Sequence, residues 1–98
     1  MRSSANGDDE GPYEILWSSR AKRSSGRLPT KVALAAVEFV HARLAQNPRR
    51  AGKELGLELR GVWSARLGDF RILYEIDDER RRVTVLELTH RSDAYRTR

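Results

Sequence analysis

Apolar residues recur at three- and four-residue intervals between Thr30 and Asn47, while polar residues take the other side. The apolar positions of this stretch are Val32, Ala33, Ala36, Val37, Val40 and Leu44. This spacing predicts an amphipathic helix that buries one face. Thr30 can cap its start, and the helix should end at Asn47 because the residue before Pro48 avoids the α region.

A short run in which apolar and polar residues alternate precedes this helix, at residues 13–17, and predicts a strand. Ser18 or Ser19 can cap a helix that follows the strand. Residues 20–28 are mostly polar, and Pro29 comes next, so this first helix is expected to be short.

The second half of the chain contains three further alternating runs, at residues 62–67, 70–76 and 83–89, which predict strands. Residues 49–53 are expected to form a basic loop before them. The predicted fold class is therefore α+β, with two N-terminal helices packed on one face of a small twisted antiparallel sheet in the order β-α-α-β-β-β.

Only Gly68 and Asp69 separate the first two of these runs, which is the length of a tight hairpin turn. If Leu67 faces Phe70, then Arg66 lies opposite Arg71, on the face away from the apolar residues. Directly opposed like charges destabilise a sheet by roughly 0.2–1 kcal/mol, so the pair favours a bound anion such as phosphate. Internal neutralisation is the alternative, with three candidate carboxylates at Glu58, Asp69 and Glu75.

The connection at residues 77–82 is expected to be an even-length turn. It would place Thr84, Leu86, Leu88 and His90 on the face that holds Arg71, so that His90 lies near the arginine pair. The same register sends Glu87 to the apolar face, which leaves an odd loop or a β-bulge as the alternative.

Charge indicates the kind of partner. Lys and Arg total 19 against 14 Asp and Glu, and without residues 1–10 the balance is 18 against 11. Sixteen of the cations are arginine, whose planar fork binds phosphate at two points. An anionic partner is one interpretation, and a solvated arginine-rich surface is the other.

Several function classes are excluded by what the sequence lacks. There is no cysteine, so disulfides, thiolate nucleophiles and sulfur-ligated metals are ruled out. No apolar run approaches the roughly 20 residues of a membrane span, and the start of the chain is charged where a signal peptide is apolar. We expect a cytoplasmic protein with a disordered leader at residues 1–11 and one domain at residues 12–98.

Metal-free cleavage of RNA needs a base for the 2′-hydroxyl, an acid for the leaving oxygen and cations for the phosphate. His90 could transfer a proton, and Arg66, Arg71 and Arg91 could hold the phosphate. The alternative for His90 is a surface or packing role. No cofactor or metal is predicted, because the acidic residues 77–79 are typical of a solvated turn and no phosphate-binding glycine loop is present.

The stretch NPRRAGKELGLELRGVWSARLGDFRILYEIDD, at residues 47–78, together with THRSDAYR near the end, resembles the RelE/ParE superfamily of type II toxin–antitoxin systems. The resemblance covers roughly the second half of the chain, and the order of elements agrees in the first half. It implies a toxin that cuts messenger RNA in the ribosomal A site by 2′-hydroxyl attack on the neighbouring phosphate, and that is held inactive by a cognate antitoxin.

The resemblance also implies roles for individual residues. Arg71 matches the family arginine at the phosphate, and Arg91 matches a second functional arginine. His90 matches the near-terminal histidine of the YoeB branch, Tyr95 resembles a terminal tyrosine, and Glu54 could match the glutamate base of that branch.

The sequence departs from the family pattern at one point. The lysine pair of the best-known RelE proteins would fall at Val62 and Ser64, neither of which can replace a lysine in proton transfer. The base is therefore unassigned between Lys53, Glu54 and His90, with Lys53 otherwise expected to bind substrate alongside Arg66.

Two other functions remain open. Some relatives with this fold poison DNA gyrase and do not cut RNA, and fold alone does not separate the two activities. A catalytically inactive domain that binds RNA or titrates an antitoxin is the third possibility, which the missing lysines leave open.

Overall fold

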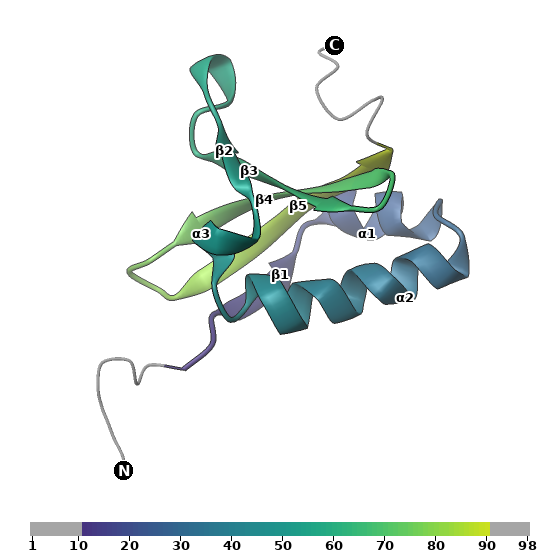
Figure 1. Ribbon diagram of the computed structural model, residues 1–98, viewed down its shortest axis with the longest axis horizontal. Coiled ribbons are helices and arrows are strands. Elements are labelled where there is room, and N and C mark those ends of the chain that lie inside the picture. Colours follow the sequence, from purple (N-terminus) through teal and green to yellow (C-terminus); the bar gives the residue numbers. More distant parts are fainter. Residues whose placement is uncertain (1–10, 91–98) are drawn as a thin grey trace.

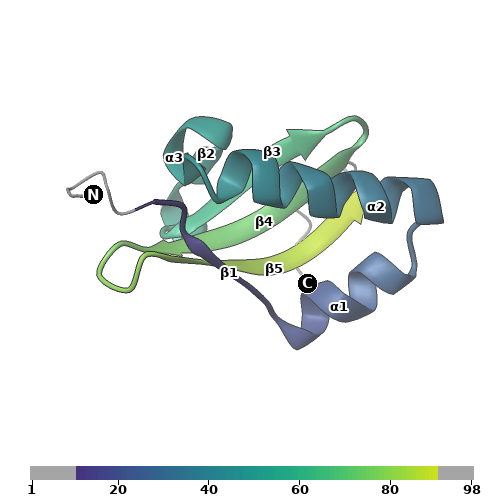
Figure 2. The same ribbon diagram turned by 90° about the horizontal axis from the view of Figure 1, so that it is seen from below.

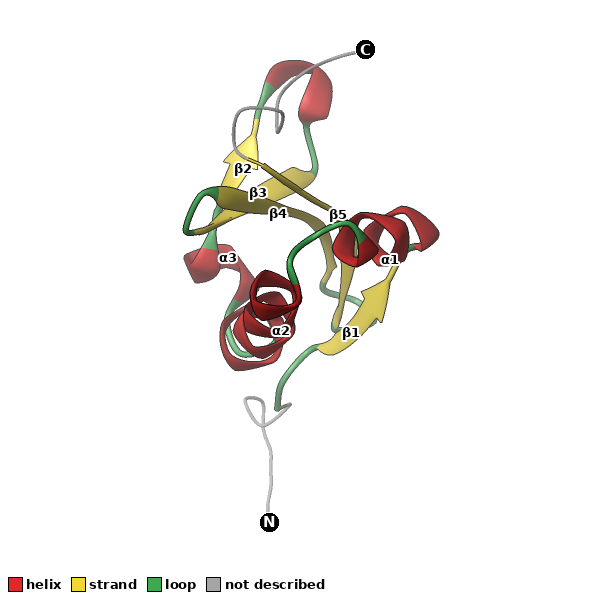
Figure 3. Cartoon of the chain, turned by 90° about the vertical axis from the view of Figure 1, so that its right-hand side faces the viewer, coloured by secondary structure: helices red, strands yellow, loops and turns green. Residues whose placement is uncertain are grey.

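The computed structural model describes residues 11–90 of the 98-residue chain. A five-stranded sheet with strand order β1-β5-β4-β3-β2 carries helices α1 and α2 on the same face (Figures 1 and 3). The elements in chain order are β1 (Glu14–Trp17), α1 (Ser19–Gly26), α2 (Thr30–Phe39), η2 (Val40–Leu44), α3 (Pro48–Ala51), β2 (Lys53–Leu55), η3 (Leu57–Leu59), β3 (Val62–Leu67), β4 (Phe70–Asp77) and β5 (Arg82–His90). The predicted α+β class and the two helices on one face are confirmed. None of the helices within residues 11–90 is long and apolar enough to cross a bilayer.

The sheet is mixed, so the prediction of a purely antiparallel sheet is wrong in one strand. β1 runs parallel to β5, with Ile15 opposite Val83. The two strands are far apart in sequence, because both long helices and the strands β2, β3 and β4 lie between them along the chain. The prediction of a basic loop at residues 49–53 is also wrong. Pro48 begins the short helix α3, and Lys53 opens β2, which pairs with β3.

Helix α1 begins as predicted and covers the part of β5 that β1 does not reach. The Ser18 hydroxyl accepts a hydrogen bond from the Ala21 N–H at 3.0 Å and donates one to the Leu86 carbonyl at 2.9 Å. Further along, the buried Ser24 hydroxyl accepts from the Leu88 N–H at 3.0 Å. Figure 2 shows α1 beside the end of β5, beyond β1.

Helix α2 starts at Thr30 but is not capped by it, because Pro29 holds the cap position and no side chain caps the helix there. The helix continues into a single π-helical turn, η2, which is closed by a hydrogen bond from the Ala45 N–H to the Val40 carbonyl at 2.9 Å. The predicted apolar face is only partly buried, since Val37 is 43% exposed.

The core lies between the helices and one face of the sheet. The predicted inward positions Ala65, Ile72 and Tyr74 are fully buried. Their partners in the core are Ala21, Ala36, Val40, Leu44, Val83, Val85 and Leu88. Small residues on the helices let α1 and α2 approach the sheet closely, and β-branched residues of the central strands fill the space below.

A β-bulge in β5 changes the face of the last strand residues. The turn has the predicted even register, with Asp77 opposite Arg82, but the pairing shifts between Leu73 and Tyr74. Leu86 is the extra residue, so Glu87 lies opposite Leu73 on the face away from the helices. There its carboxylate approaches Arg20 at 3.9 Å.

The predicted placement of Leu88 and His90 beside Arg71 is therefore wrong. Leu88 lies opposite Ile72 in the core, and His90 lies opposite Phe70, while Thr89 is the residue opposite Arg71. The bulge is favourable because it keeps a leucine buried and a glutamate out of the apolar layer.

At the start of β2 the chain passes very close to β3 and β4. A Cβ atom at Gly52 would lie 2.5 Å from both the Ser64 carbonyl oxygen and the Tyr74 hydroxyl oxygen. That hydroxyl donates a buried hydrogen bond to the Pro48 carbonyl at 2.6 Å, and burial raises the pKa of Tyr74 to about 12. Tyr74 and Gly52 together fix where α3 ends and where Lys53 begins β2.

We predict that Gly52→Ala will lower the free energy of unfolding by about 1–3 kcal/mol, because backbone and a buried hydroxyl must move to admit the methyl group. Urea unfolding of the variant measures this. Gly56→Ala is the matched control, since a Cβ there meets no atom within 4 Å. Equal stability of the two variants would contradict the close approach at Gly52.

Candidate active site

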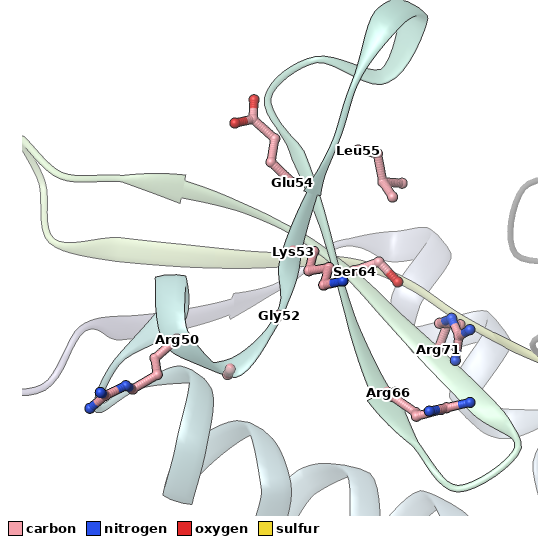
Figure 4. Close-up of a pocket in the computed structure, with 9 residues that line it drawn as sticks. Arg50, Gly52, Lys53, Glu54, Leu55, Ser64, Arg66 and Arg71 are labelled. Atoms are coloured by element: carbon pink, nitrogen blue, oxygen red, sulfur yellow. The ribbon is translucent and has the colours of Figure 1, made fainter.

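A basic pocket of about 510 Å³ opens on the sheet face opposite the helices. Its lining residues are Arg50, Ala51, Gly52, Lys53, Glu54, Leu55, Ser64, Arg66 and Arg71 (Figure 4). Four of the nine are cations and one is an acid, so the pocket suits an anionic ligand.

The centre of the pocket is the arginine pair predicted from the hairpin turn. Leu67 lies opposite Phe70 and Arg66 lies opposite Arg71, as the two-residue turn required. Gly68 has φ of +59°, a left-handed conformation that glycine adopts without strain. Figure 4 shows the two arginine side chains extending to the same side of the hairpin.

Lys53 and Ser64 extend the same face toward β2. Lys53 is the direct partner of Ser64, and Ser64 is two residues from Arg66 along β3, so all three side chains point to one side. Ser64 is 8% exposed, whereas Lys53 and Arg66 are exposed to solvent.

Glu54 lies at the rim of the pocket but belongs to the other face of the sheet. It is the partner of Trp63, and its carboxylate accepts a hydrogen bond from the Gly61 N–H at 2.9 Å. Figure 4 shows the carboxylate directed away from Arg66 and Arg71. The structure therefore separates this sequence candidate from the arginine pair.

His90 is not among the residues that line the pocket. Its ring packs edge-on against Phe70, with centroids 5.4 Å apart and an angle of 78° between the planes. The β5 bulge accounts for this position. Arg91 and Tyr95, the two remaining candidates, lie outside the described residues, as does the predicted leader apart from Gly11.

The carboxylates considered as internal counter-ions do not take that role within residues 11–90. Glu58, Asp69 and Glu75 take part in none of the ion pairs formed there, and neither does Arg66. Within the same range, no three His, Asp or Glu side chains are grouped closely enough to hold a metal ion. The site is organised around fixed positive charge.

A network of polar contacts, which sequence reasoning missed, attaches α3 to the β4–β5 turn. The Asp78 carboxylate accepts two hydrogen bonds from Arg49, at 2.9 and 2.7 Å, and one from the Tyr13 hydroxyl at 2.7 Å. The Arg49 guanidinium also lies 5.8 Å from the Trp63 ring centre. Arg49 comes four residues before Lys53, so this network holds one wall of the pocket.

The chain is similar to known proteins both in sequence and in fold. The family model described as the ParE toxin of type II toxin–antitoxin system, parDE, matches residues 15–95. Toxin RelE of Mycobacterium tuberculosis is 46% identical over 88 residues, which cover 90% of this chain and 91% of that protein. Toxin RelG of the same organism is 44% identical over 85 residues, covering 87% and 98%. The toxin–antitoxin complex RelBE2 of M. tuberculosis contains a chain of the same fold, with a TM-score of 0.79, 42% identity, and coverage of 82% of this chain and 99% of that one.

The Asp78 network predicts a specific acid sensitivity. The hydrogen bonds from Arg49 and Tyr13 lower the pKa of Asp78 from 3.8 to about 2. Because the folded-state pKa is the lower one, this stabilisation is complete above about pH 4 and is lost as the pH falls toward 2. The side chain is 54% exposed, so the contribution should stay below about 1 kcal/mol.

We expect Asp78→Asn to be less stable than the parent above pH 4, with the difference shrinking toward pH 2. Urea unfolding at a series of pH values measures it, with Glu79→Gln in the same turn as the control. A difference between Asp78→Asn and the parent that did not change with pH would contradict the assignment.

Proposed function

The chain belongs to the RelE/ParE superfamily of type II toxin–antitoxin toxins, and on this premise we propose that it is a ribosome-dependent, metal-independent endoribonuclease that cuts messenger RNA. One observation carries the proposal. Arg66 and Arg71, on neighbouring strands, present two guanidinium groups side by side in an open pocket.

The cleavage step uses these two cations at the scissile phosphate. The 2′-oxygen of one nucleotide attacks the adjacent phosphorus, the bond from phosphorus to the 5′-oxygen breaks, and the products are a 2′,3′-cyclic phosphate and a 5′-hydroxyl end. Negative charge gathers on the phosphate oxygens as the new bond forms. Arginine remains protonated throughout and donates two parallel hydrogen bonds, which stabilise that charge.

The shape of the site favours RNA presented as a single strand. The pocket lies on an open sheet face, where an extended backbone can reach the cations. A messenger codon in the ribosomal A site is such a substrate, and its use implies action in the cytoplasm. Arg91 stays in the proposal as a further phosphate contact, and Tyr95 as a further substrate-binding residue.

The partner that restrains the toxin is proposed to be a cognate antitoxin. A relative at 42% identity is known in a toxin–antitoxin complex. An antitoxin that covers or distorts the basic face would block access of RNA to Arg66 and Arg71.

Inhibition of DNA gyrase is the second candidate function. The family model that matches residues 15–95 is described as a ParE toxin. The arginine pair and the pocket that surrounds it favour phosphate chemistry on RNA, and the two functions leave different products in the cell.

We predict that Arg71→Ala will abolish growth arrest and lower RNA cleavage about 100-fold or more, because the phosphate loses one of its two central cations. Growth after induction measures the arrest, and primer extension on messages from the same cells measures the cleavage. Antitoxin binding, measured by pull-down, should persist. Arg27→Ala, at an exposed arginine after α1, is the matched control and should remain toxic. Undiminished arrest by the Arg71 variant would refute the phosphate assignment.

Expression of the parent chain should also produce new 5′-hydroxyl ends within translated codons, which primer extension maps. Plasmid supercoiling measured in the same cells tests the alternative. Loss of negative supercoiling while messages stay intact would establish the gyrase function in place of the nuclease.

A further inference from the structure

Cleavage requires a proton for the leaving oxygen, and few groups in the pocket can supply one. Arginine does not release its proton under physiological conditions, which sets aside Arg50, Arg66 and Arg71. Among the described residues that line the pocket, only Lys53 and Glu54 carry side chains that exchange protons readily.

Glu54 is poorly placed for this task. Its cross-strand partner is Trp63, so its side chain leaves the sheet on the face opposite Arg66. Its carboxylate is also engaged by the Gly61 N–H at 2.9 Å. A proton carrier for a phosphate held by the arginine pair must come from the other face.

Lys53 stands on the correct face and close to the pair. In an antiparallel sheet the Cβ atoms of direct partners such as Lys53 and Ser64 are about 5 Å apart, and diagonal neighbours such as Lys53 and Arg66 are about 7–8 Å apart. A four-carbon side chain spans such a separation. Figure 4 draws Lys53 next to Ser64, on the side of the hairpin from which Arg66 and Arg71 extend.

The backbone origin of Lys53 is unusually well fixed for an edge strand. The preceding residue, Gly52, packs directly against the Ser64 carbonyl, and the Tyr74 hydroxyl holds the Pro48 carbonyl at 2.6 Å. The backbone of Lys53 is therefore fixed beside the phosphate site, while its long, solvent-exposed side chain can adjust the position of the ammonium group.

We propose that Lys53 is the general acid of the cleavage step, an inference that rests on the proposed nuclease function. As the bond from the 2′-oxygen to phosphorus forms and the bond to the 5′-oxygen breaks, the Lys53 ammonium gives a proton to the 5′-oxygen. The proton of the 2′-hydroxyl passes to solvent water, and the neutral amine then regains a proton from solvent. No other reactant is needed.

A leaving-group substitution tests the proton transfer directly. The substrate is a synthetic mRNA bound to ribosomes, with the 5′-oxygen at the cleaved position of the A-site codon replaced by sulfur. A thiolate leaves without protonation. Lys53→Met should therefore cut the ordinary mRNA about 100-fold more slowly than the parent, yet cut the sulfur-bridged mRNA at nearly the parent rate. Arg71→Ala should be slow on both.

Lys53→Arg separates proton donation from positive charge. It should keep the parent KM but lose kcat on the ordinary mRNA, because arginine retains the charge and does not release a proton. Parent-like kcat in this variant, or equal losses of Lys53→Met on both substrates, would overturn the acid role. A parent protein that cuts neither substrate would instead refute the proposed nuclease function.

The cross-strand register supplies a positional test. Moving the ammonium to the directly opposite residue, in the double variant Lys53→Ser with Ser64→Lys, should regain at least about tenfold of the rate lost in Lys53→Ser alone. Circular dichroism checks that the double variant folds. A folded double variant that stays as slow as Lys53→Ser would overturn the placement of the proton donor.

Discussion

The two-residue turn at Gly68 and Asp69 is the constraint on which the rest of the site depends. It permits one register for β3 and β4, and that register sets Arg66 against Arg71. The repulsion between the two guanidinium groups is offset because Ala65 and Ile72, on the same strands, are fully buried on the other face. Burial on one side of the hairpin thus maintains an unfavourable juxtaposition of charges on the other.

The surrounding elements turn this pair into a pocket. β2 adds Lys53 to the face, and it can run so close to β3 because Gly52 has no side chain. Arg49 binds Asp78 and so joins α3 to the turn that follows β4. The segment that precedes Lys53 is therefore held at α3 by this ion pair and at Gly52 by its packing against β3. The arginine pair comes from one local hairpin, whereas Lys53 and the Arg49–Asp78 wall are placed by contacts between separate elements, so a short motif encodes only the centre of the site.

The sequence predicted the central hairpin well because a turn of fixed length and strict alternation leave little freedom. It failed at β5, where one extra residue at Leu86 reverses the face of all that follows, and so His90 lies against Phe70. Alternation alone cannot locate a bulge, although the misplaced Glu87 was a sign of one. β2 was missed because a three-residue strand shows little periodicity of its own. The strand β1 was predicted from its alternation, but alternation does not say which strand it pairs with or in which direction.

The hydrogen bonds that attach α1 to β5 also reduce the strand edge that the sheet exposes to a second copy of the chain. β5 is nine residues long, and a bare strand of that length would offer its backbone to another copy. β1 covers its first part, and the hydroxyls of Ser18 and Ser24 occupy backbone groups of Leu86 and Leu88 beyond it. The strands left at the margins have only four and three residues, too few to template growth of a fibril. Ser18, which caps α1, and Ser24 within it thereby reduce the edge through which the sheet could pair with another copy.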